Sequence, residues 1–142
     1  MRTLGVDVGT RRVGLAISDP SGTLARPLMT VRVTSVADAV DRVLAEVVRL
    51  RAEDDGLARI VVGVPAHLDG SPTRETGQVT GFIEKLRAGT PVPVVGEDER
   101  LTSREAESRL AVTERDWRKR KQQLDAVAAA IILQDHLDRH NR

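Results

Sequence analysis

The sequence predicts an α/β fold in which a mixed five-stranded sheet carries helices on both faces. Three observations predict it: strand patterns follow one another closely near the N-terminus, two short apolar segments come later, and helical periodicity fills the stretches between and after them. Strands joined by tight turns pair antiparallel, whereas strands joined through a helix pair parallel, so the sheet is mixed. Because the chain has 142 residues and no internal repeat or long Pro/Gly/Ser linker, we expect a single domain over residues 1–142.

The N-terminal strands are expected to form an antiparallel meander. Residues 4–8 and 13–18 have the composition of strands, and the turn Gly9-Thr10-Arg11-Arg12 joins them. Residues 23–33 supply a third strand, which Pro27 interrupts because proline cannot donate to a ladder of hydrogen bonds.

Helices and strands are then expected to alternate. Ser35 caps a first helix, whose apolar positions recur at helical spacing until Gly56. Residues 60–64 are wholly apolar, which is typical of a buried parallel strand. A second helix ends at Gly89, and residues 92–95 form the last strand.

Two further helices are expected to complete the chain. The capping-box spacing of Thr102 and Glu105 predicts the start of a third helix. Residues 124–137 form a fourth, with its apolar stripe turned inward. The expected order is therefore βββαβαβαα.

Composition excludes several classes of protein. No apolar run approaches the ~20 residues that span a bilayer, and Asp7 stands where a signal peptide needs its apolar core. We therefore expect a cytoplasmic protein that does not enter a membrane. The chain has no cysteine, so carboxylates or the three histidines would have to hold any metal, which favours Mg²⁺ or Mn²⁺.

Charge is unevenly distributed although the net charge is only +1. Residues 34–99 contain 7 basic and 12 acidic side chains, whereas residues 100–121 contain 8 basic and 4 acidic ones. Arginine matches phosphate oxygens in bidentate geometry, so this pattern suggests a phosphodiester ligand; a solvated helix face is the alternative interpretation. With Phe82 and Trp117 as the only aromatic residues, the backbone of a nucleic acid would be recognised rather than stacked bases.

Acidic residues stand at three informative places. Asp7 lies in an otherwise apolar strand, the run Glu97-Asp98-Glu99 follows the last strand, and Asp125 begins the last helix. Three such acids can meet at one sheet edge and hold two divalent ions for phosphodiester hydrolysis. In the alternative interpretation, residues 98–99 and Asp125 cap helices and Asp7 pairs with Arg11 or Arg12.

Four segments of the chain resemble motifs of the YqgF/RuvX family, within the RNase H-like superfamily that includes the RuvC resolvases. They are Gly5-Val6-Asp7-Val8-Gly9-Thr10-Arg11-Arg12-Val13-Gly14-Leu15-Ala16, Gly63-Val64-Pro65 with Leu68-Asp69-Gly70-Ser71, Asp98-Glu99-Arg100-Leu101-Thr102-Ser103 with Glu105-Ala106, and Leu124-Asp125-Ala126-Val127-Ala128-Ala129-Ala130-Ile131-Ile132-Leu133. The resemblance implies an RNase H-like fold and a metal-dependent nuclease that acts on structured nucleic acid, and the three acids suit a two-metal Mg²⁺ or Mn²⁺ site. Two departures stand out: residues 60–64 carry no acid, unlike RuvC, and Gln123 replaces a frequent lysine, whose charge Arg120 or Lys121 could supply.

The expected catalytic and metal-binding residues are Asp7, Glu99 and Asp125, with Asp98 as the other candidate for the second acid. Phosphates of the substrate would meet basic side chains: Arg11, Arg12, Arg100, Arg115, Arg118, Lys119, Arg120 and Lys121. His67 could also contact substrate, whereas His136 and His140, near the chain end, are expected to be exposed helix residues.

The resemblance implies processing of the 5′ end of pre-16S rRNA in ribosome biogenesis. A Holliday junction resolvase and a non-catalytic ribosome-assembly module that binds nucleic acid are the alternatives. The partner is then precursor rRNA or branched DNA, and a homodimer is allowed. A sugar-kinase or actin-like ATPase also begins with a segment like Asp7-Val8-Gly9-Thr10, but it needs two such domains, and 142 residues accommodate one.

Overall fold

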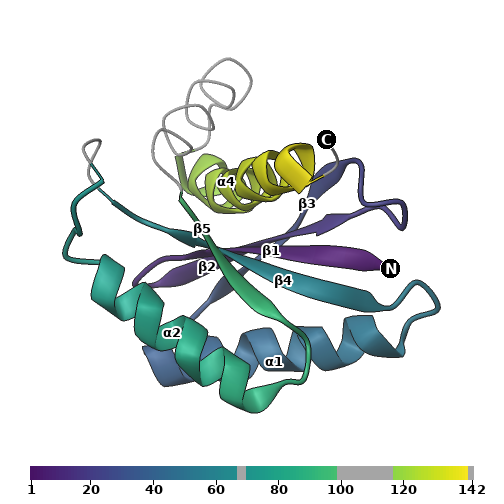
Figure 1. Cartoon of the computed structure of the whole chain (residues 1–142). Coiled ribbons are helices and arrows are strands. Elements are labelled where there is room, and N and C mark those ends of the chain that lie inside the picture. The colour runs from purple at the N-terminus through teal and green to yellow at the C-terminus, as the bar shows by residue number, and fades with distance from the viewer. Residues whose placement is uncertain (67–69, 99–116, 141–142) are drawn as a thin grey trace.

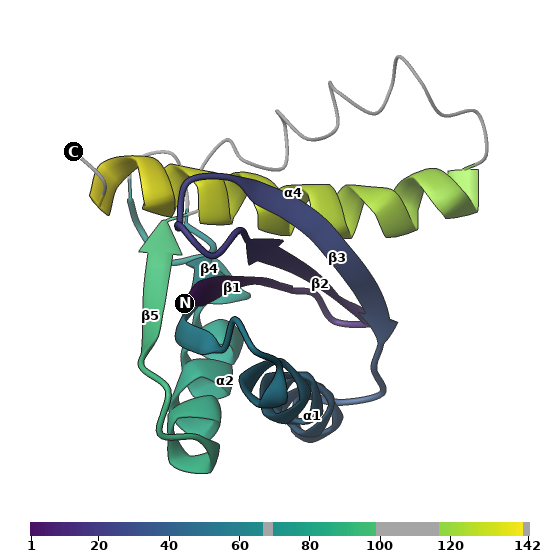
Figure 2. The ribbon, with the colours of Figure 1, turned by 90° about the vertical axis from the view of Figure 1, so that its right-hand side faces the viewer.

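The fold is a mixed five-stranded sheet covered by helices on both faces, as the sequence predicts. A computed structural model of the chain describes residues 1–66, 70–98 and 117–140, and within the last range it describes side chains from Asp125 onward. The strands lie in the order β3-β2-β1-β4-β5. Figure 2 shows α4 on one face of the sheet and α1 and α2 on the other.

The first three strands form the predicted meander. β1 (Arg2–Val8) pairs antiparallel with β2 (Arg12–Ser18), which pairs antiparallel with β3 (Ala25–Arg32). Pro27 does not break β3. The pairing with β2 instead changes register between Leu15 and Ala16, which face Met29 and Pro27, so Leu28 is the extra residue of a bulge. β3 is an edge strand, where proline is tolerated.

Two helical crossovers add the parallel half of the sheet (Figure 1). α1 (Val36–Ala52) leads to β4 (Leu57–Val64), which is parallel to β1, and α2 (Thr76–Gly89) leads to β5 (Val94–Asp98), which is parallel to β4. Ser35 caps α1 as predicted, because its side chain accepts a hydrogen bond from the Asp38 N–H. The carboxyl ends of β1, β4 and β5 therefore share one edge of the sheet with the start of β2.

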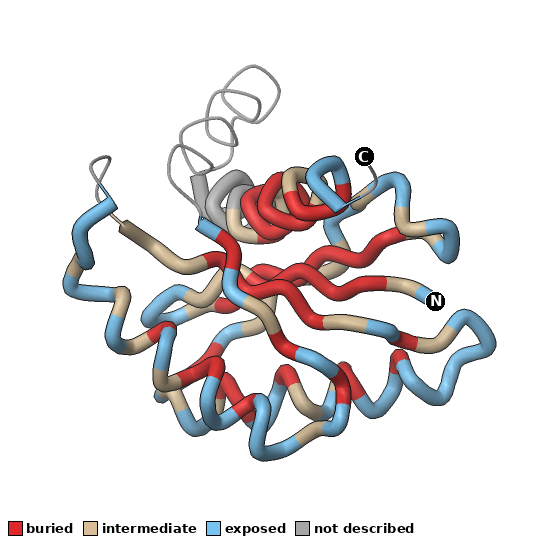
Figure 3. The backbone as a smooth tube through the Cα atoms, viewed as in Figure 1, coloured by how far each residue is buried: buried red, intermediate tan, exposed pale blue. Residues whose placement is uncertain are grey.

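Two apolar layers hold the helices against the sheet, and Figure 3 shows buried residues on both of its faces. The larger core lies under α1 and α2 and includes Leu4, Leu15, Ile60 and Phe82, all completely buried. The smaller layer, between the sheet and α4 (Trp117–His140), is made of small and aliphatic residues such as Ala16, Ala129 and Leu133. Within the described ranges, no helix combines the length and apolar character needed to span a bilayer.

Several element boundaries differ from the sequence prediction. The last strand runs over 94–98 rather than 92–95, so Glu97 and Asp98 belong to the strand and do not follow it. The last helix begins at residue 117 instead of 124, because the basic and Gln residues before the apolar stripe are strong helix formers. The predicted helix that would open at Thr102 lies outside the described residues.

Candidate active site

The turn between β1 and β2 places two arginines at the carboxyl edge of the sheet. The Gly9 N–H donates a 2.9 Å hydrogen bond to the Arg12 carbonyl oxygen, which closes the turn. A Cβ atom on Gly9 would lie 2.7 Å from that oxygen, so the tight approach requires glycine. Arg11 is exposed at the turn, and Arg12 is half-buried where β2 begins.

Asp7 and Asp125 come together on the α4 side of this edge. Asp7 is half-buried near the end of β1, and its cross-strand partner is Gly14. A Cβ atom on Gly14 would lie only 2.0 Å from the backbone oxygen of Asp125, so α4 packs directly on this pair. Cross-strand partners point to the same face of a sheet, so Asp7 faces the start of the described part of α4. The sequence prediction that these two acids approach one another is consistent with this packing.

Arg12 forms an ion pair with Asp125. Its Nε donates to Asp125 Oδ2 at 2.8 Å, and the two side chains are 23% and 25% exposed. In the alternative interpretation of the sequence, Arg11 or Arg12 pairs with Asp7. The ion pair of Arg12 is formed with Asp125, the acid of the last helix. The pair borders a hollow of about 330 Å³, whose lining consists of Gly9, Thr10, Arg11, Arg12 and Asp125.

The two acids of β5 point in opposite directions, as strand alternation predicts. Asp98 is exposed, whereas Glu97 is 7% exposed and faces α4. Glu97 accepts hydrogen bonds from Arg139 and from Nδ1 of His136, the latter at 3.2 Å. Glu97 therefore anchors the carboxyl end of β5 to the last helix.

His136 is buried, so the expectation that it is an exposed helix residue is wrong. Only 3% of it is exposed, and its Nε2 lies 3.0 Å from Nη1 of Arg59. Because arginine can only donate, Nε2 accepts, and the imidazole is neutral with its proton on Nδ1. Burial lowers the pKa of His136, against the opposing effect of the hydrogen bond that it donates to Glu97. The missed signal was its spacing of three residues from Leu133 and four from Ile132, which places it on the inward stripe; His140 is exposed, as expected.

Several predicted site residues are not placed by the structure. His67, Glu99, Arg100 and Arg115 lie outside the described residues. Four basic residues belong to the first turns of α4, and the structure describes only their backbone: Arg118, Lys119, Arg120 and Lys121. Among the described residues there is no group of three acidic, histidine or cysteine side chains that could hold a metal ion.

Comparison with solved structures identifies the class of fold. Thermus thermophilus RuvC in complex with a Holliday junction substrate matches with a TM-score of 0.54 and 18% identity, covering 99% of this chain and 96% of that one. The fowlpox virus Holliday junction resolvase matches with a TM-score of 0.53 and 13% identity, covering 98% and 99%. At these identities the likeness establishes the fold alone. The chain therefore has an RNase H-like fold, with two acids and an ion-paired arginine at the carboxyl edge of its sheet.

Sequence comparison then identifies the family. The model of the RuvX family, described as Holliday junction resolvase, matches residues 1–139. A protein of Anaeromyxobacter dehalogenans strain 2CP-1 is 45% identical over 140 residues and carries the name "Putative pre-16S rRNA nuclease"; the match covers 98% of both chains. A protein of Chloroflexus aggregans with the same name is 43% identical over 135 residues, covering 95% of this chain and 92% of that one. The chain belongs to the RuvX family.

Proposed function

We propose that this protein is a metal-dependent nuclease that hydrolyses phosphodiester bonds in structured nucleic acid, on a single domain of residues 1–142. The observation that carries the proposal is the packing of Asp125 against Gly14, the cross-strand partner of Asp7. It brings two acids from opposite ends of the chain to one sheet edge, in a family with nuclease-named relatives. The preferred substrate is the 5′ end of pre-16S rRNA, in the cytoplasm.

The two placed acids suit a hard divalent cation. Carboxylate oxygens are preferred ligands of Mg²⁺ and Mn²⁺, and both acids are partly exposed on regular elements. In our proposal the carboxylates of Asp7, Asp125 and Glu99 would together hold two divalent ions. When bound, such ions would supply an activated water for in-line attack and charge stabilisation for the leaving 3′-oxygen.

Glu99 is preferred to Asp98 as the second acid. Glu97 faces α4, the helix that carries Asp125, whereas Asp98 is exposed on the other side of β5. From its spacing of two residues, the sequence alone predicts Glu99 on the same face as Glu97. We therefore propose Glu99 as the essential acid, and Asp98 as a weaker contributor.

Arginines at the same edge have two proposed roles. Arg12 orients the Asp125 carboxylate through its 2.8 Å hydrogen bond. Arg11, exposed in the turn and lining the same hollow, contacts substrate phosphate. The basic side chains of the segment 115–121, with Arg100 and His67, would extend this contact.

The test is cleavage by Asp7→Asn and Asp125→Asn variants, with Asp55→Asn as the control. Asp55 is an exposed acid outside the site. Substrates are a precursor 16S rRNA 5′ end and a four-way DNA junction, each with Mg²⁺ and with Mn²⁺. We expect both site variants to lose roughly a hundredfold or more in kcat, with unchanged far-UV circular dichroism and with Asp55→Asn like the wild type. Cleavage by Asp7→Asn within twofold of the wild type, with unchanged metal dependence, contradicts the proposed site.

Two further results separate the alternatives. Faster cleavage of the DNA junction than of the RNA favours a resolvase, which is the description of the family model. Binding without metal-dependent cleavage of either substrate favours a non-catalytic assembly module.

Glu99→Gln should abolish turnover, and Asp98→Asn should weaken it less; the reverse ranking means that Asp98 is the second acid.

A further inference from the structure

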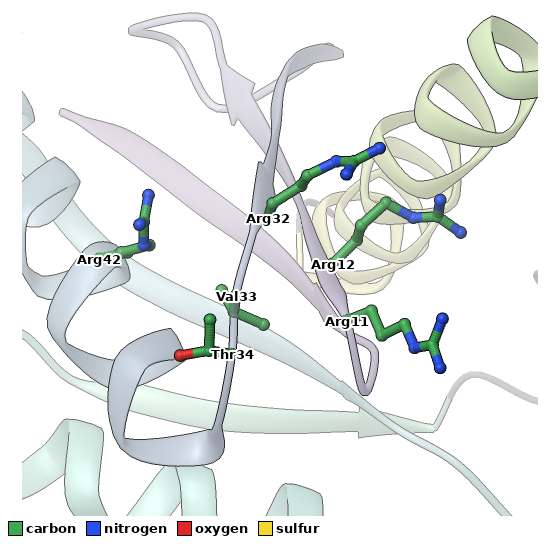
Figure 4. A pocket seen from close by; sticks show the side chains of 6 residues that line it. All are labelled: Arg11, Arg12, Arg32, Val33, Thr34 and Arg42. Atoms are coloured by element: carbon green, nitrogen blue, oxygen red, sulfur yellow. The ribbon is translucent and has the colours of Figure 1, made fainter.

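Four arginines from one turn, two strands and one helix line a pocket beside the candidate active site. Arg11 and Arg12 come from the β1–β2 turn and the start of β2, Arg32 from the end of β3, and Arg42 from α1. Figure 4 shows these four side chains around Val33 and Thr34. The pocket has a volume of about 400 Å³. No local sequence pattern marks Arg32 or Arg42, because only the fold brings them to the turn.

Local contacts only partly neutralise the positive charge of this pocket. Arg12 pairs with Asp125, and Arg42 Nε donates to Asp38 Oδ1 at 3.2 Å. Arg11 and Arg32 form no ion pair among the described residues. Arg12 and Arg32 are also direct cross-strand partners, an arrangement of like charges that destabilises a sheet. An anionic ligand between these side chains would remove that repulsion.

The backbone around the pocket is well fixed. The buried Val33 donates its N–H to the carbonyl oxygen of Arg11 at 2.9 Å, which ties the end of β3 to the turn. The N–H of Thr34 donates to Asp38 Oδ2 at 2.9 Å, beside the Ser35 cap of α1. The guanidinium groups therefore project from fixed Cα positions, which lowers the entropy lost on binding.

Continuity with the acidic site indicates a polymeric ligand. Arg11 and Arg12 also line the hollow that contains Asp125, so the two cavities share a wall. A strand whose phosphate lies at Asp125 can extend directly past Arg11 into the arginine pocket. The lining contains no aromatic side chain, so it offers contacts to phosphates and sugars and no platform for base stacking.

We propose that this arginine pocket binds the sugar–phosphate backbone of the nucleic acid, a few phosphates away from the bond that is cleaved. The proposal rests on the nuclease function proposed above and adds the path of the substrate strand. Arg32 and Arg42 bind phosphates there, and Arg11 belongs to both cavities.

The test measures binding apart from cleavage. The variants are Arg32→Gln, Arg42→Gln and the double variant. The matched controls are Arg26→Gln, exposed on β3, and Arg51→Gln, exposed on α1; each changes net charge equally on the same element outside the pocket.

The probe is a fluorescein-labelled RNA hairpin with a single-stranded 5′ extension, titrated in EDTA at several salt concentrations. We expect each pocket variant to bind roughly tenfold more weakly at low salt. The slope of log affinity against log salt should fall by about 0.7 to 0.9 per arginine. In cleavage assays KM should rise and kcat should stay within about twofold. The control variants should bind like the wild type.

Three outcomes overturn the proposal. The double variant has the affinity and the salt slope of its controls, or its kcat falls while its KM is unchanged. In the third outcome, the double variant keeps its affinity for RNA, and the only change is that inorganic phosphate no longer competes with the RNA. The last result would identify a small-anion site. The Asp7→Asn variant separates this proposal from the nuclease function. If Asp7→Asn cleaves normally while the pocket variants lose RNA affinity, the nuclease site is wrong and the pocket stands. If Asp7→Asn is inactive while the pocket variants bind normally, only the pocket is wrong.

Discussion

Replacing Gly14 by alanine tests whether the close approach of α4 to the sheet is what positions Asp125. The added Cβ would lie 2.0 Å from the Asp125 backbone oxygen and 2.9 Å from the Ala126 nitrogen, whereas real Cβ contacts are essentially never under 3.0 Å. Because both atoms belong to backbone, no rotamer change relieves the clash, and α4 must move by about 1 Å. Overpacking of this kind costs about 1 to 3 kcal/mol. A misplacement of about 1 Å can lower the rate of a positioned reaction by about a hundredfold.

Two other glycines make the prediction quantitative. A Cβ on Gly5 would lie 2.8 Å from Leu133 Cβ and 2.9 Å from the Ala129 oxygen, a milder clash under the same helix. Gly81 in α2 has nothing within 4 Å of an added Cβ, so Gly81→Ala should stabilise the helix by up to about 1 kcal/mol. Urea unfolding should rank stability as Gly81→Ala, then Gly5→Ala, then Gly14→Ala. Gly14→Ala that unfolds like the wild type and retains full metal-dependent cleavage would refute the packing argument.

Three other predictions concern a helix cap, a buried histidine and the basic segment. Ser35→Ala should lower the free energy of unfolding by about 1 kcal/mol, because the cap of α1 is lost; a urea-unfolding loss below about 0.3 kcal/mol would contradict this. Burial lowers the pKa of His136 in the folded state, so the unfolded chain binds more protons at this residue. The stability that comes from the neutral imidazole is therefore complete above about pH 6.5 and is lost as the pH falls below that value. His136→Gln should remove this acid-side slope between pH 7 and 5, and an unchanged slope would refute the assignment. Arg118→Ala combined with Lys121→Ala should reduce the slope of log RNA affinity against log salt by about 1 to 2, with kcat at saturating substrate unchanged. If the double variant keeps the affinity and slope of the wild type, the basic segment is a solvated helix face.

Local patterns predicted the meander and α1 well, because strand and cap signals act over a few residues. The position of β5 could not be read in this way. Val92 is buried but lies before the strand, and Ile60 donates its N–H to the carbonyl oxygen of Pro93. An apolar run reports burial, whereas strand pairing with β4 begins only at Val94. The sequence therefore placed the core correctly and shifted the strand.

Side-chain partners between distant elements were harder to predict than the elements themselves. The approach of Asp125 to β1 and β2 was expected from its place on an inward stripe, but its ion pair with Arg12 was not. His136 lies on the same stripe, yet its role depends on Glu97 and Arg59, which come from two different strands. Such contacts depend on register and on where the helix crosses the sheet, and neither is encoded in the local sequence around each residue.

The bulge and the proline in β3 bear on how copies of this protein can associate. An open sheet exposes unpaired N–H and C=O groups along its outer strands, which can recruit a strand from another molecule. In β3 the extra residue, Leu28, bends the strand, and Pro27 contributes no N–H. Extension of the sheet from one copy into another across this edge is therefore disfavoured. If the protein forms a homodimer, we expect the two copies to meet through side chains on another surface, and the β3 edge to resist strand-by-strand aggregation.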